Sequence, residues 1–169
     1  IFRDVYKCNI INKFKELMNS GKIDIITSAA THGFLPLLGI NPESIRAQIA
    51  VGIQVYEKFF GVKPRGIWLP ECGYCPQVEP VLKENDIEYF IMESHGILYA
   101  DPRPVFGTYA PIVTPSGLVA FGRDIESSKQ VWSSVEGYPG DFDYRDFYRD
   151  IGYDLDYDYI KDYISPDGR

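Results

Sequence analysis

The stretch GIWLPECGY, residues 66–74, decides how the chain is interpreted. Residues 65–69 predict a short buried strand, and Pro70 ends it because proline has no N–H for the ladder. Glu71 follows directly. The apolar residues before it predict a partly desolvated carboxylate, which favours a functional role over that of a solvated loop residue.

Helices and strands alternate around this stretch. Upstream, an apolar stripe predicts a helix over residues 5–19, and a β-branched run predicts a strand over residues 23–29. A second helix is expected from its cap Asn41 to its stop signal Gly61. Strands separated by helices pair in parallel through right-handed crossovers. The fold class is therefore α/β, as a barrel or as an open doubly wound sheet.

Downstream of residue 74, a short helix after Pro80 leads to a strand over residues 87–92. Two further strands, over residues 109–113 and 118–121, flank the turn sequence TPSG and predict a hairpin. From Asp124 onward the chain is rich in Tyr and Asp, with helical stretches. No repeat or linker interrupts it, which predicts one domain.

Polar side chains follow the predicted strands. His32 comes after the first strand, Glu71 after the second, Glu93 and His95 after the third, and Asp124 after the last. Because the carboxyl ends of parallel strands meet at one edge of a sheet, these side chains are expected to converge on a catalytic centre. Taken singly, each also has a structural explanation, for example a hydrogen-bonded structural histidine at His32.

Aromatic residues are concentrated in the last third of the chain, and Trp68 lies on the second predicted strand. They are suited to stacking on the apolar faces of sugar rings, but packing in a core or between tyrosine-rich helices is an equally compatible explanation. The set in the last third is Tyr109, Trp132, Tyr138, Phe142, Tyr144, Phe147, Tyr148, Tyr153, Tyr157 and Tyr159.

The overall composition excludes some classes of partner. The formal net charge of −7 argues against nucleic acid, which requires clustered Lys and Arg, and suits a neutral polyhydroxyl substrate. No apolar run approaches the roughly 20 residues that a membrane span needs. The odd cysteine count of 3 indicates a reducing compartment, so a cytoplasmic location is expected.

Cys72 and Cys75 form a CxxC pair, which by itself indicates a thiol-disulfide oxidoreductase. Glu71 argues against that function, because a neighbouring carboxylate raises a thiol pKa. A metal site would need two more ligands, and only His32 and His95 are available as histidines. We therefore expect neither a metal nor a cofactor.

Several segments resemble glycoside hydrolase family 57. The segments ATHGFLP at 30–36 and GIWLPECGY at 66–74 are similar to two conserved regions of that family. The segments VWSS at 131–134, GYPGD at 137–141 and YRDIG at 148–152 look like its 1,4-α-glucan branching enzymes. The resemblance covers nearly the whole chain. One departure is the cysteine at position 75.

The resemblance implies a catalytic domain built as an incomplete (β/α)7 barrel, with Glu71 as nucleophile and His32 at the donor-sugar site. Trp68, His95 and Asp124 are the further expected substrate-binding residues. The family's histidine-bearing first strand would precede Ile1, and its acid–base aspartate would follow Arg169. Residues 1–169 are therefore expected to be a single-domain fragment of the barrel, with flanking parts missing at both ends and no activity alone.

The implied chemistry needs two carboxylates about 5–5.5 Å apart across an α-1,4 glycosidic bond. Glu71 would form a covalent glycosyl-enzyme, and a hydroxyl group would then release the sugar. A branching enzyme uses the 6-hydroxyl of another glucan chain and forms α-1,6 branches. An α-amylase uses water, and a 4-α-glucanotransferase uses a 4-hydroxyl; both remain alternatives.

Overall fold

The computed structural model describes residues 3–5, 7, 9–141 and 155–162. The chain divides into two compact units, residues 1–123 and 124–169. The single domain over residues 1–169 stays a prediction. The first unit contains the sheet and the residues around Glu71.

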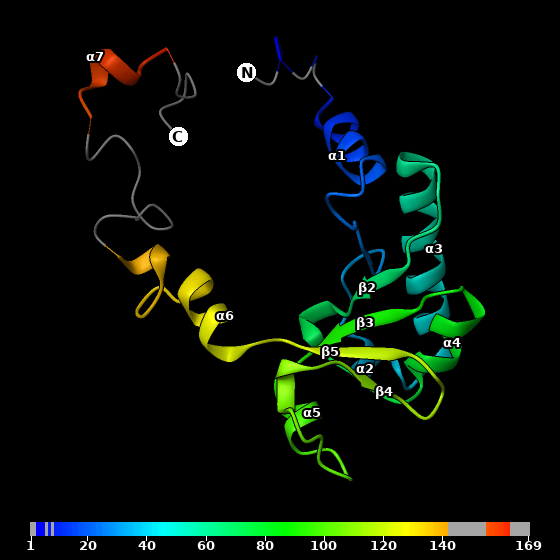
Figure 1. The fold of residues 1–169 in the computed structure, drawn as a ribbon. Coiled ribbons are helices and arrows are strands. Elements are labelled where there is room, and N and C mark those ends of the chain that lie inside the picture. Colours follow the sequence, from blue (N-terminus) through cyan, green and yellow to red (C-terminus); the bar gives the residue numbers. More distant parts are fainter. Residues whose placement is uncertain (1–2, 6, 8, 142–154, 163–169) are drawn as a thin grey trace. The chain divides into compact units, whose positions relative to one another are not determined.

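The sheet has 5 strands in the order β1-β2-β3-β5-β4 (Figure 1). The first four in this order are parallel neighbours, and β4 pairs antiparallel with β5 at the edge. This confirms both the parallel pairing and the hairpin. The strands are β1 Thr27–Ser28, β2 Gly66–Trp68, β3 Tyr89–Met92, β4 Ile112–Val113 and β5 Val119–Gly122.

Helices connect the parallel strands as predicted. Helix α3 (Pro42–Phe60) lies between β1 and β2, and α4 (Val78–Glu84) lies between β2 and β3. The remaining elements of this unit are short or peripheral: α1 Ile10–Asn19, α2 Leu35–Leu38, η1 Pro70–Cys72, α5 Ser94–Leu98 and η2 Gly107–Tyr109.

The ends of α3 follow directly from its sequence. The Asn41 side chain accepts a hydrogen bond from the Glu43 N–H at 3.2 Å, which caps the first turn. Gly61 ends the helix in the left-handed conformation, with φ of 79°.

Several predicted boundaries were wrong. The strand predicted over residues 109–113 is reduced to β4, since Gly107–Tyr109 forms η2 instead. Helix α1 begins at Ile10 rather than residue 5, because Asn9 caps it by accepting from the Asn12 N–H at 3.4 Å. The strand predicted over residues 23–29 is reduced to β1, which pairs with β2 alone among the described strands. Helix α4 begins before Pro80, since a proline in the first turn loses no helical hydrogen bond.

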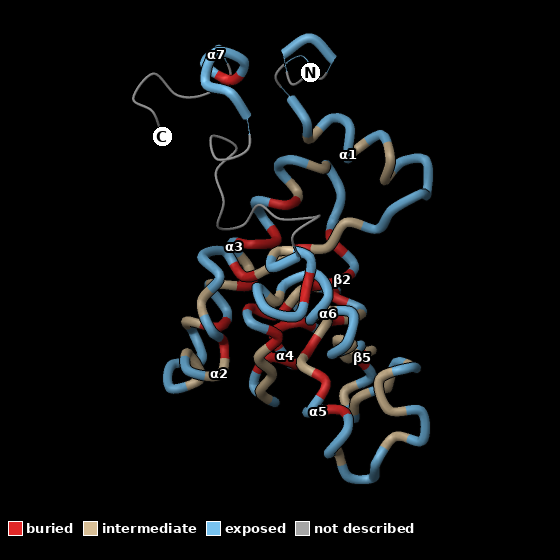
Figure 2. Tube along the Cα trace, turned by 90° about the vertical axis from the view of Figure 1, so that its left-hand side faces the viewer, coloured by how far each residue is buried: buried red, intermediate tan, exposed pale blue. Residues whose placement is uncertain are grey.

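Helices α3 and α4 cover one face of the sheet, and the core lies between the sheet and these helices. Figure 2 shows buried residues concentrated along the strands and on α3. Phe90 of β3 and Ile67 of β2 have no exposed surface. The α3 and α4 residues in this core are Ile45, Ile49, Ile53, Val78, Val81 and Leu82.

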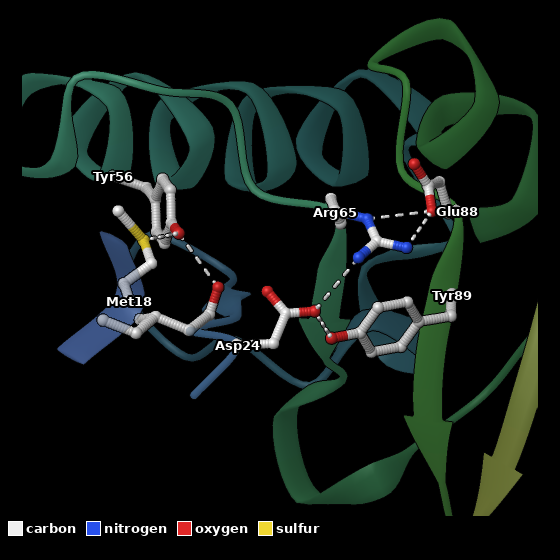
Figure 3. Close-up of polar contacts among 7 residues, drawn as sticks. Met18, Asp24, Tyr56, Arg65, Glu88 and Tyr89 are labelled. Atoms are coloured by element: carbon white, nitrogen blue, oxygen red, sulfur yellow. Dashed lines mark hydrogen bonds and ion pairs between the residues drawn. The ribbon is translucent and has the colours of Figure 1, made fainter. Parts of the chain in front are cut away.

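Polar side chains gather at the amino ends of the strands (Figure 3). The Tyr89 hydroxyl donates to Asp24 at 2.7 Å, and Arg65 donates to Glu88 at 2.8 Å. Burial, together with this hydrogen bond to Asp24, raises the pKa of Tyr89 to about 12. Nearby, Tyr56 of α3 donates to the Ile25 carbonyl at 2.9 Å. The cluster lies at the opposite strand ends from Glu71, where it ties the strands together.

The second unit contains α6 (Ile125–Trp132), η3 (Tyr138–Gly140) and α7 (Tyr157–Ile160). Trp132 and Tyr159 expose 67% and 70% of their surfaces, so neither packs in a core among the described residues. Five of the predicted aromatics, and the segment at 148–152, lie outside the described residues. These five aromatics are Phe142, Tyr144, Phe147, Tyr148 and Tyr153.

Every described helix is too short or too polar to cross a lipid bilayer.

Candidate active site

Glu71 lies in a tight turn at the carboxyl end of β2. Both Glu71 and Cys72 adopt left-handed conformations, each with φ of 53°, which is uncommon for residues with a side chain. Hydrogen bonds hold the turn, from Cys72 N to the Leu69 carbonyl at 2.8 Å and from Glu93 N to the Cys72 carbonyl at 2.9 Å. The turn directs the Glu71 side chain outward, with 71% of it exposed. The expected partial desolvation of this carboxylate was therefore wrong.

His32 lies beside Glu71. The two residues follow neighbouring parallel strands, and His32 Nε2 is 3.5 Å from Glu71 Oε1. His32 is also left-handed, with φ of 55°, and its N–H donates to the Ala29 carbonyl at 3.0 Å. The prediction that both side chains share one rim of the sheet is confirmed.

Gln48 of α3 holds the loop that contains His32. Its backbone carbonyl accepts from Ala30 N at 2.9 Å, and its side-chain Oε1 accepts from Thr31 N at 3.0 Å. Its Nε2 donates to Thr31 Oγ1 at 2.7 Å. Sequence reasoning missed Gln48, because no local signal connects a helical glutamine to a loop 17 residues away.

A cavity of about 280 Å³ lies next to Glu71. His95 and Glu93 line it, so the side chains that follow β2 and β3 converge there as predicted. The ring of Phe34 forms one wall and packs on Gly73, where an added Cβ would lie 2.2 Å from the ring. A cavity with apolar walls that is also lined by carboxylate and imidazole groups is suited to binding a sugar ring. The lining is Phe34, Pro36, Glu71, Cys72, Gly73, Tyr74, Met92, Glu93, His95 and Gly96.

Glu93 has a structural role. It forms an ion pair with Arg123 at 3.1 Å and caps α5 by accepting from the N–H and hydroxyl of Ser94. Burial alone would raise the pKa of Glu93, but the Ser94 hydrogen bonds and the Arg123 charge outweigh it and hold the pKa below its ordinary value. Glu93 therefore stays ionised and is unsuited to donate a proton.

Glu79 of α4 also supports the cavity, and sequence reasoning missed it. Its side chain is 7% exposed, and its carboxylate accepts hydrogen bonds from Tyr74, Thr114 and Ser116. Tyr74 lines the cavity and stacks on Phe90 with ring centroids 5.6 Å apart. Glu79 thereby connects the β4–β5 turn to the cavity wall.

Residues 3–165 match the sequence profile of glycosyl hydrolase family 57. The chain belongs to this family. Its β1-β2-β3-β5 run, with crossover helices, confirms the predicted part of an incomplete (β/α)7 barrel, and the sheet does not close among the described residues.

The family 57 relatives include both branching enzymes and amylases. The alpha-amylase AmyC from Thermotoga maritima is 53% identical, with a TM-score of 0.83 over 99% of this chain and 32% of its own. A branching enzyme from Pyrococcus horikoshii is 43% identical, with a TM-score of 0.74 over 88% of this chain and 30% of its own. A 1,4-alpha-glucan branching enzyme of Thermococcus kodakarensis is 42% identical over 87% of this chain. The chain spans 26% of the length of that last relative.

The pKa shifts of Cys72 and Cys75 are opposite to those of a reactive dithiol. Cys72 and Cys75 are both free thiols, and Cys72 is 1% exposed. Burial raises the pKa of each thiol, and for Cys72 it outweighs the opposing charge of Arg123. Reactive cysteines need the opposite shift.

The substrate-binding roles expected for Trp68 and Asp124 stay predictions. Trp68 lies on β2, partly buried, between Ser28 and Ile91 in the ladder. Asp124 caps α6 by accepting from Ser127 N at 2.8 Å, and it belongs to the second unit. Among the described residues, no three His, Cys, Asp or Glu side chains form a group that could hold a metal ion.

Proposed function

We propose that Glu71 is the catalytic nucleophile of a retaining enzyme that acts on α-1,4-glucan. The observation that supports this is an exposed carboxylate at the carboxyl end of β2, beside a cavity and 3.5 Å from His32. Exposure suits a nucleophile, because the attacking oxygen must reach the anomeric carbon of a bound sugar. The cavity walls and His95 would bind that sugar.

The reaction proceeds in two displacements. Glu71 attacks the anomeric carbon, the glycosidic C–O bond breaks, and a second carboxyl group protonates the leaving oxygen. That group then removes a proton from the acceptor hydroxyl, whose oxygen displaces Glu71 and restores the α configuration. Glu93 is unsuited to the acid–base role, since the hydrogen bonds from Ser94 and the charge of Arg123 hold its pKa below the ordinary value. The aspartate expected after Arg169 stays the proposed acid–base group.

Within this chemistry, the 6-hydroxyl of a second glucan chain is the first proposed acceptor, which makes the protein a 1,4-α-glucan branching enzyme. The similarity to two branching enzymes over 87–88% of the chain supports it. Hydrolysis by water is the second candidate, favoured by the 53% identity to an alpha-amylase. A cytoplasmic location stays a prediction from the cysteine count.

The nucleophile is tested in the polypeptide that contains these residues together with the remainder of a family 57 domain, called the full-length enzyme below. Glu71→Gln keeps the size of the side chain but removes the attacking anion, so activity on amylose should fall roughly 10³-fold or more. Glu88→Gln, at the opposite strand ends, is the matched control and should remain active. Wild-type activity in Glu71→Gln would refute the proposal.

A smaller substitution identifies the role of the carboxylate. Glu71→Ala leaves space beside the anomeric carbon, so azide with an α-glycosyl fluoride donor should restore turnover and give the β-glycosyl azide. An α-azide would assign Glu71 to the acid–base role instead. NMR of the products from wild-type enzyme and amylose separates the two acceptors: α-1,6 signals without new reducing ends indicate branching, and new reducing ends indicate hydrolysis.

A further inference from the structure

The hydroxyl of Ser28 joins two parts of the proposed site. Ser28 is the last residue of β1, and its Oγ lies 3.0 Å from the Trp68 carbonyl of the paired strand. The same oxygen lies 3.2 Å from Nδ1 of His32. The other ring nitrogen of His32, Nε2, faces Glu71 at 3.5 Å. A continuous series of contacts therefore runs from the backbone of β2 through Ser28 and His32 to the Glu71 carboxylate.

The number of hydrogens decides the direction of these bonds. A carbonyl oxygen can only accept, so the single hydroxyl hydrogen of Ser28 is donated to Trp68. The Ser28 oxygen then has only lone pairs left, and His32 must supply the hydrogen from Nδ1. Nδ1 of His32 therefore carries a hydrogen, and the rotation of the ring that this bond fixes leaves the Nε2 edge toward Glu71.

Separate contacts hold the backbone of the loop that contains His32 and the imidazole ring of His32. Gln48 clamps the main chain and side chain of Thr31, which places the His32 backbone. The imidazole extends beyond that clamp and is half exposed, at 50%. Ser28 holds the ring from the sheet side.

The neighbouring residue on β1 shows that the serine contact is specific to one face. Successive side chains of a strand point to opposite faces. The Thr27 hydroxyl is directed toward α3, where it donates to the Gly52 carbonyl at 3.2 Å. Ser28 is directed toward the site. Thr27 and Ser28 are thus adjacent hydroxyl residues with different environments, which provides a matched control.

We propose that Ser28 is a positioning residue, whose hydroxyl orients the His32 imidazole so that its Nε2 edge faces Glu71 and the donor sugar. This proposal rests on the proposed function of the site. Ser28 acts through His32 and does not itself contact the substrate.

The test uses four variants of the full-length enzyme with amylose: Ser28→Ala, Ser28→Thr, Thr27→Val and the double variant Ser28→Ala with His32→Ala. Ser28→Ala should lower kcat about tenfold, the scale of one lost hydrogen bond, with a smaller change in KM. Ser28→Thr keeps the hydroxyl and should recover most of this loss. Thr27→Val should keep kcat near the wild-type value.

The double variant decides whether Ser28 acts through His32. In the His32→Ala background there is no ring to orient, so adding Ser28→Ala should change kcat less than twofold. Equal losses from Ser28→Ala in both backgrounds, or a kcat within twofold of wild type for Ser28→Ala alone, would overturn the proposal. So would a Ser28→Thr variant as impaired as Ser28→Ala. The nucleophile assignment fails separately, if Glu71→Gln keeps wild-type activity.

Discussion

Glu79→Ala tests the buried carboxylate that connects the β4–β5 turn to Tyr74. The wild-type side chain accepts three hydrogen bonds, the one from Thr114 being 2.8 Å long. At about 1.5–3 kcal/mol for each bond to a charged group, three independent bonds would give an upper bound of roughly 5–9 kcal/mol. The variant also avoids the cost of burying the charge, which is several kcal/mol. The net loss for local opening of the hairpin should therefore be about 2–4 kcal/mol.

Native-state hydrogen exchange measures this loss directly. A decrease of about 2–4 kcal/mol in the opening free energy should speed amide exchange in residues 112–122 by roughly 30- to 1,000-fold. The matched control is Glu84→Ala, because Glu84 lies on the same helix but pairs with Arg46 at the exposed surface. It should leave exchange of the hairpin nearly unchanged. Equal protection of the hairpin in wild type and Glu79→Ala would refute the assigned role of Glu79.

The same carboxylate should make stability depend on pH. Burial is the largest single influence on the pKa of Glu79 and would raise it, but hydrogen bonds from Ser116, Tyr74 and Thr114, with the charge of Lys83, together hold it below its ordinary value. A group with a depressed folded pKa stabilises the folded state above its unfolded pKa, about 4.3 for glutamate, and loses that contribution as pH falls through the folded value. The difference in thermal midpoint between wild type and Glu79→Ala should stay constant from about pH 8 to 5 and shrink below about pH 4.

Substitutions at Gly73 and at the two cysteines test the surroundings of Glu71. Gly73→Ala places a Cβ 2.2 Å from the Phe34 ring. It should displace this wall of the cavity, raise KM for maltooligosaccharides several-fold and lower the stability, and adding Phe34→Leu should recover the lost stability. An unchanged KM and melting temperature in Gly73→Ala would contradict this packing. Cys75→Ser should keep activity within about tenfold of wild type, with or without a reductant. Cys72→Ser introduces a hydroxyl at a site that is 1% exposed and should lower the unfolding free energy by about 1–2 kcal/mol. Restoration of a lost activity by a reductant would revive a redox role for the pair.

Local signals in the sequence determined the elements whose ends depend on neighbouring residues. The bounds of α3 follow from Asn41 and Gly61, whose capping chemistry acts within one helical turn. The placement of His32 and Glu71 on one rim follows from topology, because parallel strands bring their carboxyl ends to the same edge. The family could be recognised from short segments, because its characteristic residues around Glu71 are contiguous in the sequence.

Only the tertiary structure decided features that depend on residues distant in sequence or on backbone conformation. The length of β1 depends on its pairing partners, and the exposure of Glu71 on the left-handed turn that follows Pro70. Glu79 meets Thr114 across 35 residues and Gln48 meets Thr31 across 17, so no periodicity or motif predicts either contact. A sequence pattern reports which face of an element is apolar. Which hydroxyl or amide meets which partner is set by the packing of elements, because a hydrogen bond requires atoms within about 3 Å.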